Sequence, residues 1–146
     1  MLENEVFSSF MLYGTLLILK MYLIAIVTGQ LRLRRKAFIN PEDAIRHGGL
    51  QFYREDPEVE RYRRVHRNDM ETIYPFLFLG AVYSLLDPHP TVARIHFCVF
   101  FLGRLVHTVA YLLPLRAPAR SLAYSIAQLA CFSMALQIVF AVISHW

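Results

Sequence analysis

A long apolar run over residues 7–29 is the feature that most constrains how this chain folds. A helix rises about 1.5 Å per residue, so the run is long enough to cross a hydrocarbon core of roughly 30 Å. Glu3 and Glu5 precede it, whereas a cleaved signal peptide begins with basic residues and has a shorter apolar centre. We therefore expect a membrane-spanning helix that is retained in the protein.

Three further apolar runs follow, over residues 70–86, 91–113 and 121–143. The first is short, but helical spacing from Pro57 onward extends it into the aqueous phase, and Pro75 is expected to kink it. Pro114 and Pro118 separate the last two runs, and so short a connection predicts antiparallel neighbours. The chain is 56% hydrophobic and 18% charged, against roughly 45–50% and about 25% in soluble domains, which also favours a membrane protein.

These runs predict an all-α integral membrane protein with a single domain over residues 1–146. Its expected architecture is a bundle of four transmembrane helices at about residues 7–36, 57–86, 90–114 and 118–145, with a polar loop at about 37–60. Residues 31–69 carry ten of the fifteen cations. Because cationic loops stay in the cytoplasm, this loop and the connection with Arg116 are predicted to be cytoplasmic and both termini lumenal.

Several function classes do not fit this composition. The net charge of +4 and a pI near 9.3 are compatible with nucleic-acid binding, but such domains do not carry so much apolar sequence, so no nucleic-acid partner is expected. Cys98 and Cys131 lie inside apolar runs without metal-ligand spacing, and the histidines form no ligand pattern. We therefore expect no disulfide and no metal site; the lipid bilayer and small anions are the expected partners.

Ionisable groups inside spanning segments are expensive, so each is a candidate for function. They occur here in three sets, each with the spacing of one helix face. The sets are Arg64, Arg67, Asn68 and Glu71; Arg104, His107 and Tyr111; and Arg120, Ser121, Tyr124 and Gln128. The predicted topology places all three at similar depth near the cytoplasmic side, where cations, one carboxylate and hydroxyls suit a charged peptide ligand.

A simpler explanation applies to the cations near helix ends, which extend to the lipid headgroups. We assign it to Arg32, Arg34, Arg35, Lys36 and Arg116 when the residues are judged by their spacing alone. Lys20 has two possible roles: it extends to the headgroups, or it pairs with Asp69 or Glu71 of the second predicted helix.

Residues 59–76, VERYRRVHRNDMETIYPF, resemble a signature of the MAPEG family, membrane-associated proteins of eicosanoid and glutathione metabolism. Residues 40–43 (NPED), 103–111 (GRLVHTVAY) and 116–121 (RAPARS) are similar to its prostaglandin E synthase branch. The resemblance extends over nearly the whole chain from Thr15 onward.

The resemblance implies a homotrimer of four-helix subunits in the endoplasmic reticulum and perinuclear membrane, with glutathione bound between neighbouring subunits at the cytoplasmic side. Carried over residue by residue, the implied glutathione site comprises Arg32, Arg67, Asn68, Glu71, His107, Tyr111, Arg120, Ser121, Tyr124 and Gln128.

In that branch, glutathione acts as a catalyst in the isomerisation of prostaglandin H endoperoxide to prostaglandin E. Its thiolate attacks an endoperoxide oxygen, a base then removes a carbon-bound hydrogen to form the ketone, and glutathione is regenerated. Ser121, Arg120 and Asp43 resemble the residues with catalytic roles, although either Ser121 or Tyr124 has the hydroxyl to donate to the sulfur.

Two alternatives from the same family are a microsomal glutathione transferase or peroxidase and a non-catalytic lipid-presenting scaffold. The transferases tend to have alanine in place of Ser121, and the scaffold lacks the full set of arginines, represented here by Arg67 and Arg120. A transporter is disfavoured because the sequence shows no repeats or broken helices.

Overall fold

The computed structural model describes residues 4–144, and these residues are almost entirely helical. The long helices are α1 (Glu5–Arg35), α3 (Pro57–Leu85), α4 (Pro90–Leu112) and α5 (Ala117–Ile143), and between α1 and α3 lie a short helix α2 (Pro41–Arg46) and a 3-10 turn η1 (Leu50–Phe52). The expected end of the last helix at residue 145 lies outside the described residues.

The helix ends follow from local chemistry. Asn4 and Asp56 cap α1 and α3, where their side-chain oxygens accept hydrogen bonds from the Phe7, Glu58 and Val59 backbone amides at 2.9–3.2 Å. Proline occupies the first turn of α3, α4 and α5, where its missing N–H removes no helical hydrogen bond. Lys36 ends α1 in the left-handed conformation, with φ 49°.

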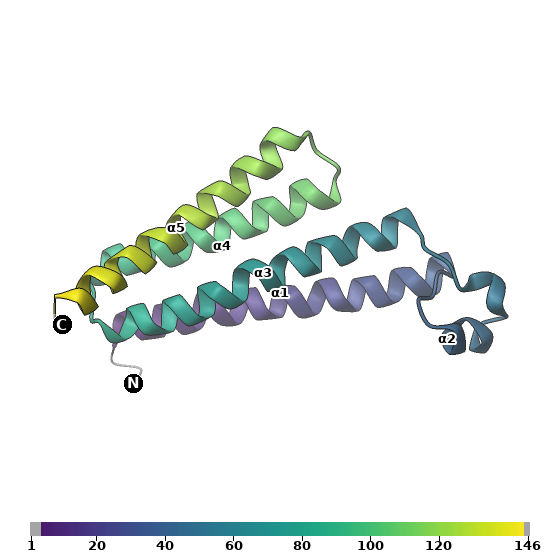
Figure 1. Cartoon of the computed structure of the whole chain (residues 1–146), viewed down its shortest axis with the longest axis horizontal. Helices are drawn as coiled ribbons and strands as arrows, with labels where there is room; N and C mark the ends of the chain where they lie inside the picture. The colour runs from purple at the N-terminus through teal and green to yellow at the C-terminus, as the bar shows by residue number, and fades with distance from the viewer. Residues whose placement is uncertain (1–3, 145–146) are drawn as a thin grey trace.

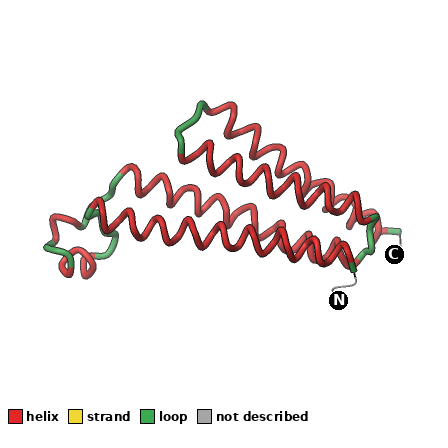
Figure 2. The backbone as a smooth tube through the Cα atoms, turned by 180° about the vertical axis from the view of Figure 1, so that it is seen from behind, coloured by secondary structure: helices red, strands yellow, loops and turns green. Residues whose placement is uncertain are grey.

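The long helices form two antiparallel pairs. α1 lies against α3, and α4 lies against α5 (Figures 1 and 2). The two pairs meet near the chain termini and diverge toward the end that carries α2 and the α4–α5 connection (Figure 1). α3 continues through Pro75 as one helix, and the bend expected there stays a prediction.

Three of the described helices, α1, α4 and α5, are long and apolar enough to cross a membrane. The sequence predicted four such helices. α3 is long enough at 29 residues, but it is not apolar enough to count as a membrane-spanning helix. The reason is its first half, which carries eight acidic or basic residues from Glu58 to Glu71, the two ends included. A membrane-spanning role for α3 therefore does not follow from its own composition.

Aromatic residues of α3 and α4 lie at the centre of the core, which also contains apolar residues of α1 and α5. Phe76 of α3 stacks on Phe100 of α4 with ring centroids 4.0 Å apart, and Phe97 meets Phe76 edge-on at 6.0 Å. α4 and α5 approach closely at Gly103, where a Cβ atom would lie 3.0 Å from the Ala127 Cβ and 3.2 Å from the Ala123 carbonyl oxygen. This close packing fixes the rotation of α5 against α4.

The segment expected to be a loop at residues 37–60 has more structure than the sequence predicted. Phe38 pairs with residues 52–54 through two backbone hydrogen bonds of 2.9 and 3.2 Å, so the segment folds back on itself around α2 and η1. α2 begins with Pro41, Glu42 and Asp43, which favour a helix start. Its six residues are too few for the apolar periodicity that identified the other helices.

Candidate functional site

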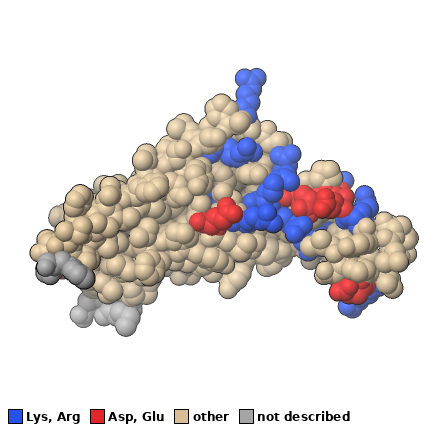
Figure 3. Space-filling model, in the orientation of Figure 1, with Lys and Arg blue, Asp and Glu red and all other residues tan. Residues whose placement is uncertain are grey.

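Charged side chains gather toward one end on one face of the molecule. In the space-filling view, the Lys, Arg, Asp and Glu side chains of that face lie in the half toward α2 and the α4–α5 connection, and the other half shows none of them among the described residues (Figure 3). The helix pairs diverge at the same end (Figure 1). This is where cavities lined by the predicted site residues are found.

The first of these, the α4/α5 cavity, lies between α3, α4 and α5 and has a volume of about 250 Å³. It contains residues from all three polar sets predicted from the sequence. Its lining residues are Asn68, His107, Tyr111, Arg120, Ser121, Tyr124 and Ser125. The cavity thus presents a guanidinium, four hydroxyls, an amide and an imidazole, and no carboxylate, which suits an anionic ligand.

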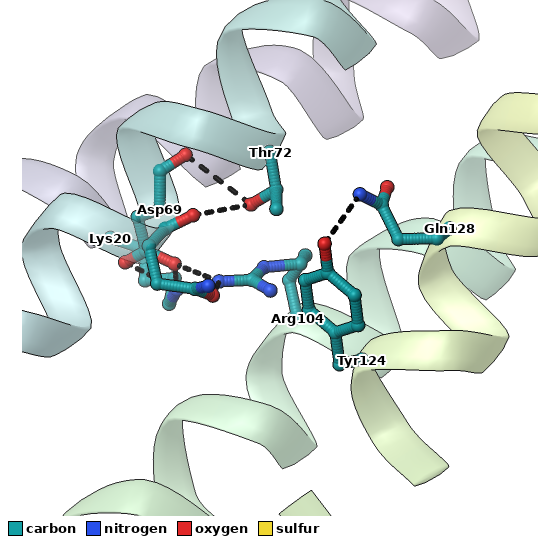
Figure 4. Close-up of polar contacts among 7 residues, drawn as sticks. Lys20, Asp69, Thr72, Arg104, Tyr124 and Gln128 are labelled. Carbon is teal, nitrogen blue, oxygen red and sulfur yellow. Dashed lines mark hydrogen bonds and ion pairs between the residues drawn. The ribbon is translucent and has the colours of Figure 1, made fainter. Parts of the chain in front are cut away.

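Aromatic rings position the polar groups of this cavity. The Arg120 guanidinium lies over the Tyr111 ring at 4.5 Å, and the Tyr111 ring meets His107 edge-on at 5.7 Å. Gln128 donates a hydrogen bond to the Tyr124 hydroxyl at 3.1 Å (Figure 4). The His107 Nδ1 atom is buried and has no hydrogen-bond partner within the described residues. The cavity therefore contains a buried polar atom that is available to hydrogen-bond with a ligand.

The second, the α1/α3 cavity, lies on the other side of α3 and has a volume of about 330 Å³. Arg32 and Arg67 line it together with Arg63 and His66. The Arg32 Nε and His66 Nδ1 atoms are buried without a partner among the residues that the structure describes. This is a second cationic cavity with unused donors.

Asp43 lies in neither cavity. With Arg32, Phe38 and His47 it lines a third one of about 450 Å³ between α1 and α2, the loop cavity. Its carboxylate accepts a hydrogen bond from the Asn40 amide at 3.1 Å, and the His47 ring stacks on Phe38 at 4.7 Å. Arg32 lines both the α1/α3 cavity and the loop cavity, so the two are neighbours along α1.

The charges deepest in the bundle form a group that we call the buried ion cluster: Lys20, Asp69 and Arg104 (Figure 4). The Lys20 ammonium and the Arg104 Nη2 atom each lie 2.6 Å from the Asp69 Oδ1 atom, and both Asp69 and Arg104 are fully buried. Of the two roles considered for Lys20, the structure shows the pairing with Asp69. The cluster joins α1, α3 and α4.

The structure does not bring all predicted site residues together within one chain. Asn68 and Arg67 are adjacent in sequence but open toward different cavities, and Glu71 is exposed and lines none of the three. Gln128 reaches the α4/α5 cavity only through Tyr124. The single face predicted for α3 therefore divides between the two sides of the helix.

Sequence reasoning missed several residues of the α1/α3 cavity. The set Arg63, His66, Arg67 and Met70 has the same spacing as the predicted set but begins one residue earlier. That spacing was available from the sequence, but only the packing of α3 against α1 distinguishes the two sets. Within residues 4–144, no three His, Cys, Asp or Glu side chains are placed as metal ligands would be.

The chain is similar to known proteins over nearly its whole length. Residues 10–140 match the MAPEG family. The chain is 66% identical over 145 residues to a prostaglandin E synthase of Equus caballus and 62% identical over 144 residues to one of Homo sapiens, covering 99% of this chain and 95% of each relative. It is 42% identical over 142 residues to microsomal glutathione S-transferase 1 of Homo sapiens, covering 94% of this chain and 92% of the relative.

Proposed function

Because the chain belongs to the MAPEG family, we propose that it is a glutathione-dependent isomerase that converts prostaglandin H endoperoxide to prostaglandin E. The full-length similarity to prostaglandin E synthases, at 62% and 66% identity, supports this activity. The α4/α5 cavity is the observation that carries the proposal, since it places Arg120, Ser121 and Tyr124 around one space.

We propose that the protein is a homotrimer in the endoplasmic reticulum and perinuclear membrane, with α3 as a fourth spanning helix. The charged end of the molecule (Figure 3) supports a cytoplasmic position for the cavities, because cationic segments stay on that side. The charged half of α3 is unsuited to contact with lipid. Packing of α3 against neighbouring subunits would keep this half away from lipid.

The proposed glutathione site combines both cationic cavities. It comprises Arg32, Arg67, Asn68, Glu71, His107, Tyr111, Arg120, Ser121, Tyr124 and Gln128. The donor set fits glutathione, which has two carboxylates and a thiol, and each cavity has buried polar atoms without a partner in the described residues. Since the residues lie on two sides of one chain, a site between subunits would join the α4/α5 cavity of one to the α1/α3 cavity of the next.

Bound glutathione would supply a thiolate that opens the peroxide bond and is regenerated at the end of the cycle. A free thiol has a pKa near 8.5, so only a few per cent is ionised at pH 7. Lowering that pKa by about two units requires roughly 2.7 kcal/mol of differential stabilisation. Ser121 as a hydroxyl donor and Arg120 as a fixed cation, both near the start of α5, would provide it together with the helix dipole.

Two further tasks fall to the protein. Arg120 would stabilise the oxygen anion that leaves when the peroxide bond opens. Asp43, from the loop cavity, would accept the carbon-bound proton whose removal forms the ketone. Tyr124 has the second hydroxyl in the α4/α5 cavity and is the alternative donor to the sulfur.

A single assay tests the function. The purified protein is given prostaglandin H with no glutathione, with a trace and with an excess, and in parallel a generic electrophile with glutathione. We expect prostaglandin E far in excess of the trace glutathione, because the thiol is not consumed.

The 42% identity to a glutathione S-transferase makes conjugation the second candidate. Conjugation of the electrophile without prostaglandin E formation would establish the transferase and contradict the isomerase. If neither product forms although the endoperoxide binds, the protein is a lipid-presenting scaffold.

A further inference from the structure

Asn68 connects the buried ion cluster to the α4/α5 cavity. Its Oδ1 atom lies 2.8 Å from the Arg104 Nη2 atom, and the same nitrogen lies 2.6 Å from the Asp69 Oδ1 atom. One Nη2 atom has two hydrogens, so each acceptor receives one of them. Asn68 also lines the cavity that contains Ser121 and Arg120.

The contact with Arg104 determines which way the Asn68 amide faces. A guanidinium nitrogen only donates hydrogen bonds, so the Asn68 atom facing it must be the carbonyl oxygen. The amide NH₂ group of Asn68 is then directed away from Arg104. The carbonyl oxygen is thereby engaged by Arg104, and the NH₂ group is the part of the amide that remains to donate elsewhere.

We propose that Arg104 is a positioning residue for the glutathione thiolate: anchored by Asp69 and Lys20, it orients Asn68 so that the amide NH₂ donates into the α4/α5 cavity. The inference rests on the proposed glutathione site. The cluster lies outside the residues that line the cavity and acts on the ligand through Asn68.

The position of Arg104 depends on few contacts. Its side-chain hydrogen bonds to described residues all use Nη2, and its Nε and Nη1 atoms are buried without a partner among them. Asp69 is in turn held by Lys20, whose ammonium lies 2.6 and 2.8 Å from its two oxygens. Burying the three charges of the buried ion cluster costs desolvation free energy. The cluster holds the Asn68 amide in a single orientation, which is the role that we assign to it.

A second polar cluster elsewhere in the bundle, without Lys, Arg, Asp or Glu, supplies a matched control. Tyr83 donates to the Gln137 Oε1 atom at 2.7 Å, the Gln137 amide donates to the Ser133 hydroxyl at 3.2 Å, and Ser133 lies 2.8 Å from the His96 Nε2 atom. This cluster also joins three helices, α3, α4 and α5, but none of its residues lines the α4/α5 cavity.

The test is a double-mutant cycle with Arg104→Lys and Asn68→Ala, and Ser133→Ala as the control. Lysine keeps the positive charge beside Asp69 but lacks the planar fork that serves two acceptors. In the absence of prostaglandin, the ultraviolet absorbance of bound thiolate is titrated against pH, and kcat and KM are then measured.

We expect each single variant to reduce kcat and the thiolate fraction at neutral pH about tenfold. The double variant should be no worse than Asn68→Ala alone, because Arg104 acts through Asn68. Ser133→Ala should change stability but not the thiolate titration. Additive losses, or a normal thiolate titration in Arg104→Lys, would overturn the proposal.

A measurement on the wild-type protein applies even if Arg104→Lys does not fold. The NMR signals of the Asn68 side-chain NH₂ group, assigned by their loss in Asn68→Ala, should shift on addition of glutathione, while those of Gln137 should not. An unshifted Asn68 signal in protein that binds glutathione would overturn the positioning role alone. Absence of glutathione binding by the wild type would overturn the proposed function together with this inference.

Discussion

The α4/α5 cavity and the α1/α3 cavity lie on opposite sides of the same helix and differ in their chemistry. The first has one guanidinium, from Arg120, among several hydroxyls, whereas the second has three guanidinium groups, from Arg32, Arg63 and Arg67; each cavity has one histidine. Hydroxyls beside a single cation suit a reacting sulfur, and a group of arginines suits ligand carboxylates. The difference suggests that one cavity activates glutathione and the other holds it.

The largest expected effect separates activation from binding. Ser121→Ala should lower isomerase turnover about 100-fold or more and remove the absorbance of bound thiolate, because the hydroxyl donor to sulfur is lost. Glutathione should still bind, as calorimetry would show. Tyr124→Phe is the matched control with a smaller loss. If Ser121→Ala keeps full turnover and the thiolate signal, activation belongs to Tyr124 or Arg120.

The complementary change is made in the α1/α3 cavity. Arg67→Ala should weaken glutathione binding about 30-fold, since a charge-assisted contact to a carboxylate is lost, while kcat at saturating glutathione changes little. Steady-state kinetics over a range of glutathione concentrations measures both. A loss confined to kcat would contradict the division of roles.

Mixed assemblies test whether the two cavities meet between subunits. Chains with Ser121→Ala and chains with Arg67→Ala are co-expressed with different tags and purified by both. In a cyclic trimer each mixed assembly regains about one third of its sites, because one interface has both wild-type residues. At a glutathione concentration well below the KM of the Arg67→Ala parent, activity well above that of either parent is expected. No recovery would indicate a site within one chain.

Glu71, which is exposed and lines neither cavity, tests how far the site extends beyond them. Glu71→Gln removes the charge that would recognise the glutathione amine, so affinity should fall about tenfold without loss of assembly. Calorimetry measures the affinity and size-exclusion chromatography the assembly. Unchanged affinity would exclude Glu71 from the site.

The smallest expected effect concerns the Tyr111 ring beneath Arg120. Tyr111→Leu should lower turnover about fivefold, because the cation–π contact at 4.5 Å is lost. Tyr111→Phe keeps the ring and should retain most turnover. Equal losses in both variants would show that the hydroxyl, and not the ring, is what the site requires.

The sequence by itself determined the helices and their chemistry. Apolar runs, with helical spacing that extends the second one back to Pro57 and with Pro90 and Pro114 near the helix ends, predicted where the long helices lie. Periodicity and proline act locally, so no knowledge of neighbours was needed. The spacing of Arg120, Ser121 and Tyr124 likewise placed these residues on one face of α5 before any packing was known.

Only the tertiary structure decided which faces meet. The set beginning at Arg63 and the set beginning at Arg64 have identical spacing and differ by a rotation of about 100° about the axis of α3. The rotation of α3 against α1 and α4 selects between them and sends Arg67 and Asn68 to different cavities. The pairing of Lys20 with Asp69 was equally undetermined, because it joins residues 49 positions apart on two helices that meet only once the bundle has packed.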